Sequence, residues 1–183
     1  MRIIAGKNKG RKLVTLPGLN TRPMTDRMKE AVFNTIGPYF CGGIVLDLFG
    51  GSGALSLEAL SRGCDRSYII DASSAAIRVI NTNIKNSGEQ ENVIILKSDY
   101  NAALNKLKKD AIKFDVVFID PPYKLIVIED VLLFLIENNM AGSGAYIICH
   151  FEKDRYNLKE RDGLDIIKTY VHAQSEVVIY KKS

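Results

Sequence analysis

The sequence lacks any apolar run long enough to cross a membrane. A transmembrane helix needs roughly 20 consecutive apolar residues, whereas the longest apolar stretch, residues 125–136, is interrupted by Glu129 and Asp130. The first residues soon become basic and contain no apolar core of the kind found in signal peptides. These absences argue against a membrane or secreted protein, and we expect a cytoplasmic one.

Cysteine and histidine are also scarce. The chain has three cysteines, Cys41, Cys64 and Cys149, and two histidines, His150 and His172. No two cysteines have the CxxC spacing of zinc sites, and an odd number does not suit a disulfide framework. We therefore expect reduced, partly buried thiols and no bound metal.

What is present fits an ordinary globular protein. The 183 residues suit one compact domain with a small appendage. A chain of this length buries roughly 70% of its unfolded surface, so it needs neither disulfides nor metal to fold. The proportions of apolar (46%) and charged (25%) residues are typical of such domains.

The excess positive charge is confined to the N-terminal fifth of the chain. Residues 1–40 carry eight basic and two acidic side chains, a net charge of +6. The remaining 143 residues carry 17 basic and 19 acidic side chains, a net charge of −2. A basic segment on a nearly neutral body is typical of a protein that binds a polyanion such as nucleic acid.

From residue 43 onward, short apolar runs alternate with segments of helical period. The runs predict strands at 44–48, 68–70, 93–96, 114–119 and 145–149. The periodic segments predict helices at 54–61, 73–86, 100–109 and 128–138. This alternation predicts an α/β fold with a doubly wound, mostly parallel sheet. The last two runs, 165–171 and 176–180, have no helix between them and predict a C-terminal antiparallel hairpin, which makes seven strands in all.

The chain before residue 43 has a different character. Residues 2–4 and 12–14 are expected to pair as a small hairpin around a basic turn. Thr25 is placed to cap a helix from Asp26 to about Ile36, with the Asp26 carboxylate favourably near the helix N-terminus. We predict a small N-terminal extension, residues 1–40, on a main domain, residues 41–183.

A glycine-rich loop follows the first predicted strand. Residues 47–53 read DLFGGSG, and a helix begins at once. Glycines allow a tight turn and the close approach of a ligand to the backbone. The loop lacks the third glycine of a dinucleotide-binding motif, and no Gly-Lys-Ser/Thr marks a P-loop. The loop instead resembles motif I of the class I, Rossmann-like methyltransferases. That resemblance implies bound S-adenosylmethionine, with Asp47 engaging its ammonium group and the backbone of Phe49, Gly50, Gly51, Ser52 and Gly53 around its methionine part.

Two further aspartates follow successive strands. Asp71 comes after the second strand, where an acidic residue can accept hydrogen bonds from ribose hydroxyls. Asp99 comes after the third strand, where methyltransferases often place a carboxylate against the adenine amino group. Since ligands of doubly wound sheets bind at the carboxyl ends of the strands, we expect these groups to converge.

The sequence Asp120-Pro121-Pro122-Tyr123 follows the apolar strand at 114–119. The two prolines stiffen the chain as it leaves the strand. The Asp120 carboxylate and the Pro121 carbonyl can then act as converging hydrogen-bond acceptors, and Tyr123 can offer a flat face to a base. We assign these three residues to catalysis.

This arrangement suits methyl transfer to an exocyclic amino group. Such a nitrogen is a poor nucleophile because its lone pair is delocalised into the ring. Two acceptors for its protons can hold it in line with the methyl group, and Asp120 can take the proton afterwards. Well-oriented reactants can gain roughly 7–11 kcal/mol from positioning alone, so no metal is required.

Several segments together resemble the RsmD family of bacterial 16S rRNA (guanine(966)-N(2))-methyltransferases. The matching segments are RIIAG at residues 2–6, KGRKL at 9–13, RPMTDR at 22–27, EAVFN at 30–34, LDLFGGSGAL at 46–55, EALSRG at 58–63 and the DPPY motif. The resemblance spans essentially the whole chain, and the N-terminal segments are the most specific to the family.

The resemblance implies methylation of the N2 amino group of one guanine in 16S rRNA. The implied substrate is an assembled or partly assembled small ribosomal subunit, and we expect the enzyme to be a monomer. Contacts to RNA are implied for Arg2, Lys9, Arg11, Lys12, Arg22, Thr25, Asp26, Arg27, Phe33 and Asn34. The basic hairpin would hold phosphates, which position RNA without reading its sequence.

Two other functions remain open. Adenine-N6 methyltransferases of nucleic acid also carry DPPY, although 183 residues leave little room for the separate target-recognition domain that the DNA enzymes generally have. A ribosome-assembly factor that binds RNA without catalysis is the other alternative, and the intact aspartates argue against it.

Overall fold

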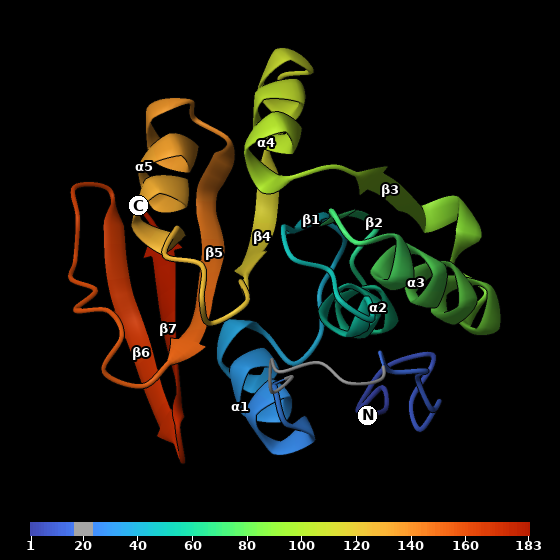
Figure 1. Ribbon diagram of the computed structural model, residues 1–183. Helices are drawn as coiled ribbons and strands as arrows, with labels where there is room; N and C mark the ends of the chain where they lie inside the picture. Colours follow the sequence, from blue (N-terminus) through green and yellow to red (C-terminus); the bar gives the residue numbers. More distant parts are fainter. Residues whose placement is uncertain (17–23) are drawn as a thin grey trace.

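The computed structural model describes residues 1–16 and 24–183. Arg22 lies outside the described residues. The described strands form one sheet of seven, in the order β3-β2-β1-β4-β5-β7-β6 (Figure 1). Their bounds are β1 Ile44–Asp47, β2 Arg66–Asp71, β3 Val93–Lys97, β4 Phe114–Ile119, β5 Ala141–Glu152, β6 Leu164–His172 and β7 Ser175–Lys182.

The sheet is parallel except at its C-terminal end. Strands β3, β2, β1, β4 and β5 run parallel to one another. Strand β7 is antiparallel to both β5 and β6 and lies between them. The order reverses between β1 and β4, which is the position where doubly wound sheets bind their ligands.

In the described part of the chain, five α-helices cover the two faces of the sheet (Figure 1). Their bounds are α1 Asp26–Ile36, α2 Ala54–Ser61, α3 Ser74–Ser87, α4 Tyr100–Lys109 and α5 Ile128–Glu137. Three begin with a side-chain cap: Thr25, Ser73 and Asp99 each accept a hydrogen bond from the backbone N–H three residues later.

The core consists of apolar layers on both faces of the sheet. Helices α4 and α5 contribute Leu104, Leu107 and Leu132 to one layer. Helices α1 and α2 contribute residues including Phe33 and Leu60 to the opposite layer. Strand β4 supplies both layers with alternate side chains, as a strand covered on both faces must.

Most predicted elements match the structure, and β5 is the main correction. Its predicted range, 145–149, is contained in a strand that begins at Ala141 and ends at Glu152. Residues 142–144 are Gly-Ser-Gly, which have low strand propensity and hide the strand from a sequence pattern. Ala141 pairs with Phe114 of β4, the register then shifts, and regular pairing with β4 and β7 begins at Tyr146.

The N-terminal segment forms the expected hairpin, but with less strand pairing than expected. Arg2 and Lys12 make a single antiparallel bridge. The backbone N–H of Ile3 donates to the Arg11 carbonyl at 3.0 Å, and that of Leu13 donates to the Met1 carbonyl at 3.1 Å. Ile3 and Leu13 are buried in a small apolar cluster with residues of α2 and α3. We call residues 1–14 the N-terminal hairpin.

In the part of the chain that the structure describes, no helix is long and apolar enough to span a bilayer.

Candidate cofactor and active site

A cavity of about 660 Å³ opens at the carboxyl ends of β1, β2, β3 and β4. Its polar lining includes Asp47, Asp71, Asp99, Asp120 and Tyr123. Phe49, Gly50, Gly51 and Ser52 of the glycine loop line it as well, and Pro121 does so beside Asp120. The structure thus brings together the strand-end residues and the loop residues proposed from the sequence, apart from Gly53 at the loop's end.

The glycine loop has the conformation that its sequence suggested. Gly53 has φ +77° at the N-cap of α2, a left-handed value that favours glycine. A Cβ atom on Gly50 would lie 2.3 Å from Ile69 Cγ2, because the loop turns tightly over β2. The Gly50 N–H donates to the Ile70 carbonyl at 2.8 Å. The loop therefore needs these two glycines for its path.

Asp47 is a buried carboxylate that is only partly satisfied. It is 1% exposed, and its Oδ2 accepts a hydrogen bond from the Ser56 hydroxyl at 2.9 Å. No described residue donates to its Oδ1. Burial raises the pKa of Asp47 to about 7, assisted by the negative charges of Asp120 and Asp71 and opposed by Ser56. A buried, half-satisfied carboxylate that lines a cavity is suited to a cationic ligand.

Asp71 and Asp99 also have structural roles. Asp71 accepts hydrogen bonds from the Gly51 N–H at 2.9 Å and from the Ser73 N–H at 2.8 Å. It thereby joins the glycine loop to the turn before α3. Asp99 caps α4 by accepting from the Ala102 N–H at 2.9 Å. Each carboxylate has remaining lone pairs that a ligand hydroxyl or amino group could use.

The charges of the lining are unbalanced. The cavity has four aspartates and one basic side chain, Lys29, among its described lining residues. The Lys29 ammonium is engaged elsewhere: it donates to the Arg2 carbonyl at 2.5 Å and lies 3.3 Å from Glu58 Oε2. Such a cavity repels the pyrophosphate of a dinucleotide and attracts a ligand with positive charge.

The DPPY segment presents its aspartate to this cavity. The Asp120 side chain is 24% exposed, and its Oδ1 lies 2.8 Å from His150 Nδ1. His150 is on β5 and is almost fully buried. The Tyr123 ring lies edge-on to the His150 ring, with centroids 6.4 Å apart. His150 was not among the residues selected from the sequence, since a single histidine inside an apolar strand carries no motif.

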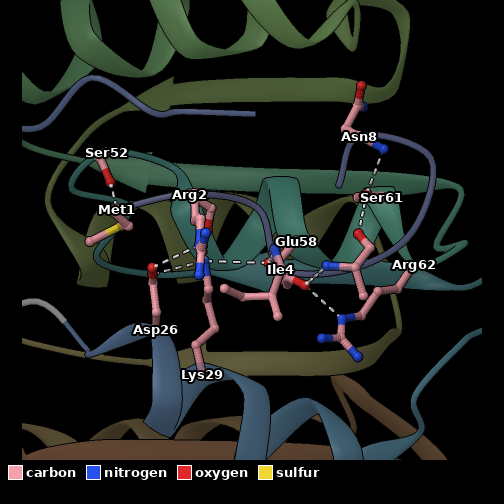
Figure 2. A network of polar contacts seen from close by, with 11 residues as sticks. Met1, Arg2, Ile4, Asn8, Asp26, Lys29, Ser52, Glu58, Ser61 and Arg62 are labelled. Atoms are coloured by element: carbon pink, nitrogen blue, oxygen red, sulfur yellow. Dashed lines mark hydrogen bonds and ion pairs between the residues drawn. The ribbon is translucent and has the colours of Figure 1, made fainter. Parts of the chain in front are cut away.

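A buried carboxylate, Glu58 of α2, holds the N-terminal hairpin in place (Figure 2). Glu58 is fully buried and accepts hydrogen bonds from the backbone N–H groups of Ile4 at 2.7 Å and Ala5 at 3.0 Å. It also lies within ion-pair distance of Lys29 and Arg62, both themselves buried. Burial lowers the pKa of Lys29, and the charge of Glu58 opposes this effect. The sequence analysis missed Glu58, because an acidic residue inside a helix has no distinguishing pattern.

The hairpin also contacts the cofactor loop. Asn83 on α3 donates to the carbonyl oxygens of both Val14 and Ser52 at 2.9 Å. The Ser52 hydroxyl lies 3.6 Å from Met1 Sδ (Figure 2). The proposed RNA-binding segment and the proposed cofactor loop are therefore packed against each other.

The structure separates the proposed RNA contacts into several groups. Lys9, Arg11 and Lys12 are exposed on the hairpin, away from the lining of the cavity. Thr25, Arg27 and Asn34 are exposed on or beside α1. The exposed Arg2 and the partly buried Asp26 form an ion pair at 3.6 Å.

Phe33 requires a correction. It is 0% exposed and packs against Phe118, with Arg62 lying 4.9 Å above its ring. Its apolar side chain belongs to the core layer between α1 and the sheet, so it is not available to contact RNA. The EAVFN segment therefore combines an exposed position, Asn34, with a core position.

The strand order, the antiparallel β7 and the ligand cavity at the reversal of strand order define a class I S-adenosylmethionine-dependent methyltransferase fold. The solved structure of the Escherichia coli protein YhhF has this arrangement, with a TM-score of 0.85 and 28% identity. It covers 100% of this chain, which in turn covers 98% of it.

Residues 1–181 match the family model described as conserved hypothetical protein 95, and the chain belongs to this family, the RsmD family. The chain is similar to ribosomal RNA small subunit methyltransferase D of Haemophilus influenzae, with 38% identity over 160 residues, 85% of this chain and 80% of that one. It is also similar to Bacillus subtilis YlbH, whose name proposes an rRNA methyltransferase, with 38% identity over 184 residues, 100% of this chain and 99% of that one.

Proposed function

We propose that this chain transfers a methyl group from S-adenosylmethionine to the N2 amino group of a guanine in 16S rRNA of the small ribosomal subunit. The coarser part of this function, S-adenosylmethionine-dependent methylation of ribosomal RNA, follows from the family and its named relatives. Asp120 at the edge of a four-aspartate cavity, beside an aromatic ring that can receive a base, supports transfer to an exocyclic amino group. The choice of guanine N2 is supported by membership of the RsmD family.

The cavity fits the cofactor. Asp47 has a buried oxygen to which no described residue donates, and the residue lines the cavity, which suits the ammonium group of the methionine part. The backbone of Phe49, Gly50, Gly51, Ser52 and Gly53 would surround that part. Asp71 would accept from the ribose hydroxyls and Asp99 from the adenine amino group. Bound S-adenosylmethionine supplies a methyl group on a positively charged sulfur, which is already activated for transfer.

The DPPY residues would prepare the acceptor nitrogen. Asp120 and the Pro121 carbonyl would accept hydrogen bonds from the two amino protons and so orient the nitrogen lone pair toward the methyl group. Tyr123 would stack on the base. As the nitrogen gains the methyl group it becomes positively charged, and its N–H proton would pass to Asp120 and then to water. Positioning and proton acceptance are thus the contributions of these residues.

The N-terminal extension, residues 1–40, would bind the RNA, and residues 41–183 would form the catalytic domain. Lys9, Arg11 and Lys12 would hold phosphates, and Arg2, Arg22, Thr25, Asp26, Arg27 and Asn34 would line the path of the RNA toward the cavity. The substrate would be an assembled or partly assembled small subunit. The enzyme would act as a monomer in the cytoplasm.

The test is methylation in vitro of small subunits from a strain that lacks the gene. Wild-type protein and Asp120→Ala would be incubated with the subunits and isotope-labelled S-adenosylmethionine, and the nucleosides would be analysed by mass spectrometry. We expect label in N2-methylguanosine with the wild type only. Label in N6-methyladenosine would instead identify an adenine methyltransferase. Cofactor binding without any labelled nucleoside would point to an RNA-binding assembly factor.

A further inference from the structure

We propose that His150 is a positioning residue that holds the carboxylate of Asp120 in its working orientation. This inference rests on the proposed function, because it assigns Asp120 the role of acceptor for the amino protons. It is carried by a short hydrogen bond between a buried imidazole and a carboxylate at the edge of the cavity.

Neighbouring strands place the two residues side by side. Strands β4 and β5 are parallel, and Ile119 pairs with Cys149. Asp120 directly follows Ile119 at the end of β4, and His150 follows Cys149 within β5, so the register of the sheet brings them side by side. His150 Nδ1 lies 2.8 Å from Asp120 Oδ1, and the histidine side chain is only 2% exposed. The donor is therefore fixed by the core, whereas its acceptor is on the loop that leaves β4.

The shared proton belongs to the imidazole. An imidazole N–H can donate a hydrogen bond to a carboxylate oxygen, whereas a carboxylate oxygen can only accept one. Nδ1–H then donates to Oδ1. Burial disfavours a charged imidazolium, but the charge of Asp120 and its hydrogen bond outweigh burial and raise the pKa of His150. Both the neutral Nδ1–H tautomer and the imidazolium can make this hydrogen bond.

The hydrogen bond gives the two oxygens of the Asp120 carboxylate different roles. Oδ1 is occupied by His150, and no described residue donates to Oδ2. We assign Oδ2 to the substrate amino group. In the proton transfer, the N–H bond of the methylated amine breaks and an O–H bond forms on Oδ2. His150 keeps its own proton throughout, so it acts only through Asp120.

His150 contacts the second functional side chain of the motif as well. The rings of Tyr123 and His150 are inclined at 70°. Edge-to-face contact at such distances is a favoured arrangement of flat rings. One buried imidazole thus lies against both the proton acceptor and the ring proposed to stack on the base.

The test compares His150→Asn with His150→Leu. The Asn side-chain amide can place an N–H close to the position of Nδ1. The Leu side chain has nearly the same size and shape as that of Asn but has no hydrogen-bond donor. We expect His150→Leu to lower kcat about 10- to 100-fold, since a small misplacement of a reacting group can cost about 100-fold. Its KM for S-adenosylmethionine should stay within about twofold of wild type. His150→Asn should recover most of the lost kcat.

A merely structural role gives a different pattern. The two variants would then lose activity in proportion to their loss of thermal stability. The N–H donor of the Asn variant would give it no higher kcat than its stability explains. Unchanged kcat in His150→Leu, or an equal loss in both variants, would overturn the assignment. If His150→Leu does not fold, the His150→Asn variant and the spectroscopic measurement below still decide the question.

The hydrogen bond can be observed without any substrate. The chain has two histidines, His150 and the exposed His172, so ¹⁵N-histidine NMR with His172→Gln as the assignment control isolates the His150 signals. We expect Nδ1 to carry a slowly exchanging proton whose shift changes in Asp120→Asn. A rapidly exchanging or absent Nδ1 proton would refute the hydrogen bond. If this signal is present but the wild type methylates no guanine, the proposed function fails while the contact stands.

Discussion

The role proposed for Asp47 predicts that the binding of S-adenosylmethionine depends on pH, and the buried position of this carboxyl group gives the direction. Its pKa is about 7 in the folded protein without ligand, compared with an ordinary value of 3.8. Burial is the main cause, so the free protein holds a proton on Asp47 below pH 7. An ammonium group beside the carboxylate favours the ionised form, and binding below pH 7 must therefore release that proton.

The magnitude follows from the size of the shift. An acid whose folded pKa is raised stabilises the folded state below its unfolded pKa and loses that contribution as pH rises to the folded pKa. A shift of about 3 pH units corresponds to about 4 kcal/mol that the free protein loses between about pH 4 and pH 7. The ammonium group of the bound ligand offsets part of the free energy needed to ionise Asp47. Affinity should therefore fall by up to tenfold for each pH unit below 7 and should level off above it.

The assay is isothermal titration calorimetry of S-adenosylmethionine between pH 5.5 and 7.5, in buffers of different ionisation enthalpy. The buffer dependence should show release of up to one proton below pH 7. In Asp47→Asn, which is uncharged and of equal size, both the release and the pH slope should disappear. The same variant should resist urea better than wild type at pH 8, although it binds the cofactor more weakly.

A matched control separates this effect from a general weakening of the site. Asp99→Asn removes another carboxylate from the same cavity, but Asp99 is exposed at the start of α4. It should weaken binding without changing the proton release. Equal affinity of the wild type at pH 5.5 and 7.5, with no proton released, would refute the role assigned to Asp47.

Three further changes probe other parts of the molecule. Glu58→Ala removes the carboxylate that two buried cations share, and it should lower the free energy of unfolding by about 3–5 kcal/mol, measured by urea denaturation. A loss below 1 kcal/mol would contradict the network in Figure 2. Neutralising Lys9, Arg11 and Lys12 together should weaken RNA binding and reduce its salt slope by about 2–3, measured by filter binding across salt concentrations; an unchanged slope would remove the hairpin from the RNA contacts. Asp120→Ala should reduce turnover to background while calorimetry still detects cofactor binding, and normal methylation by this variant would refute the mechanism.

The sequence predicted the framework of the fold closely where apolar periodicity was strong. Helices α2 and α4 and strand β4 have the predicted bounds. The early residues of β5 were missed because Gly142, Ser143 and Gly144 do not resemble a strand, and they lie where the register between β4 and β5 shifts.

The candidate site was predicted in part, and its supporting residues were not. Strand-end aspartates and a glycine loop are local features, so their convergence follows from the rule for parallel sheets. The contact of Glu58 with the backbone of Ile4 and the contact of His150 with Asp120 join residues 30 or more positions apart, which a single sequence does not show. Phe33 was misassigned because the motif that contains it has both an exposed and a core face, and only the packing distinguishes them.

The most direct test of the central proposal is the methylation state of 16S rRNA in cells without the gene. Deletion of the gene, followed by nucleoside mapping of 16S rRNA by mass spectrometry, should show the loss of N2-methylguanosine at one position. A plasmid with the wild-type gene should restore it, and one with Asp120→Ala should not. An unchanged set of N2-methylguanosines in the deletion strain would contradict the account.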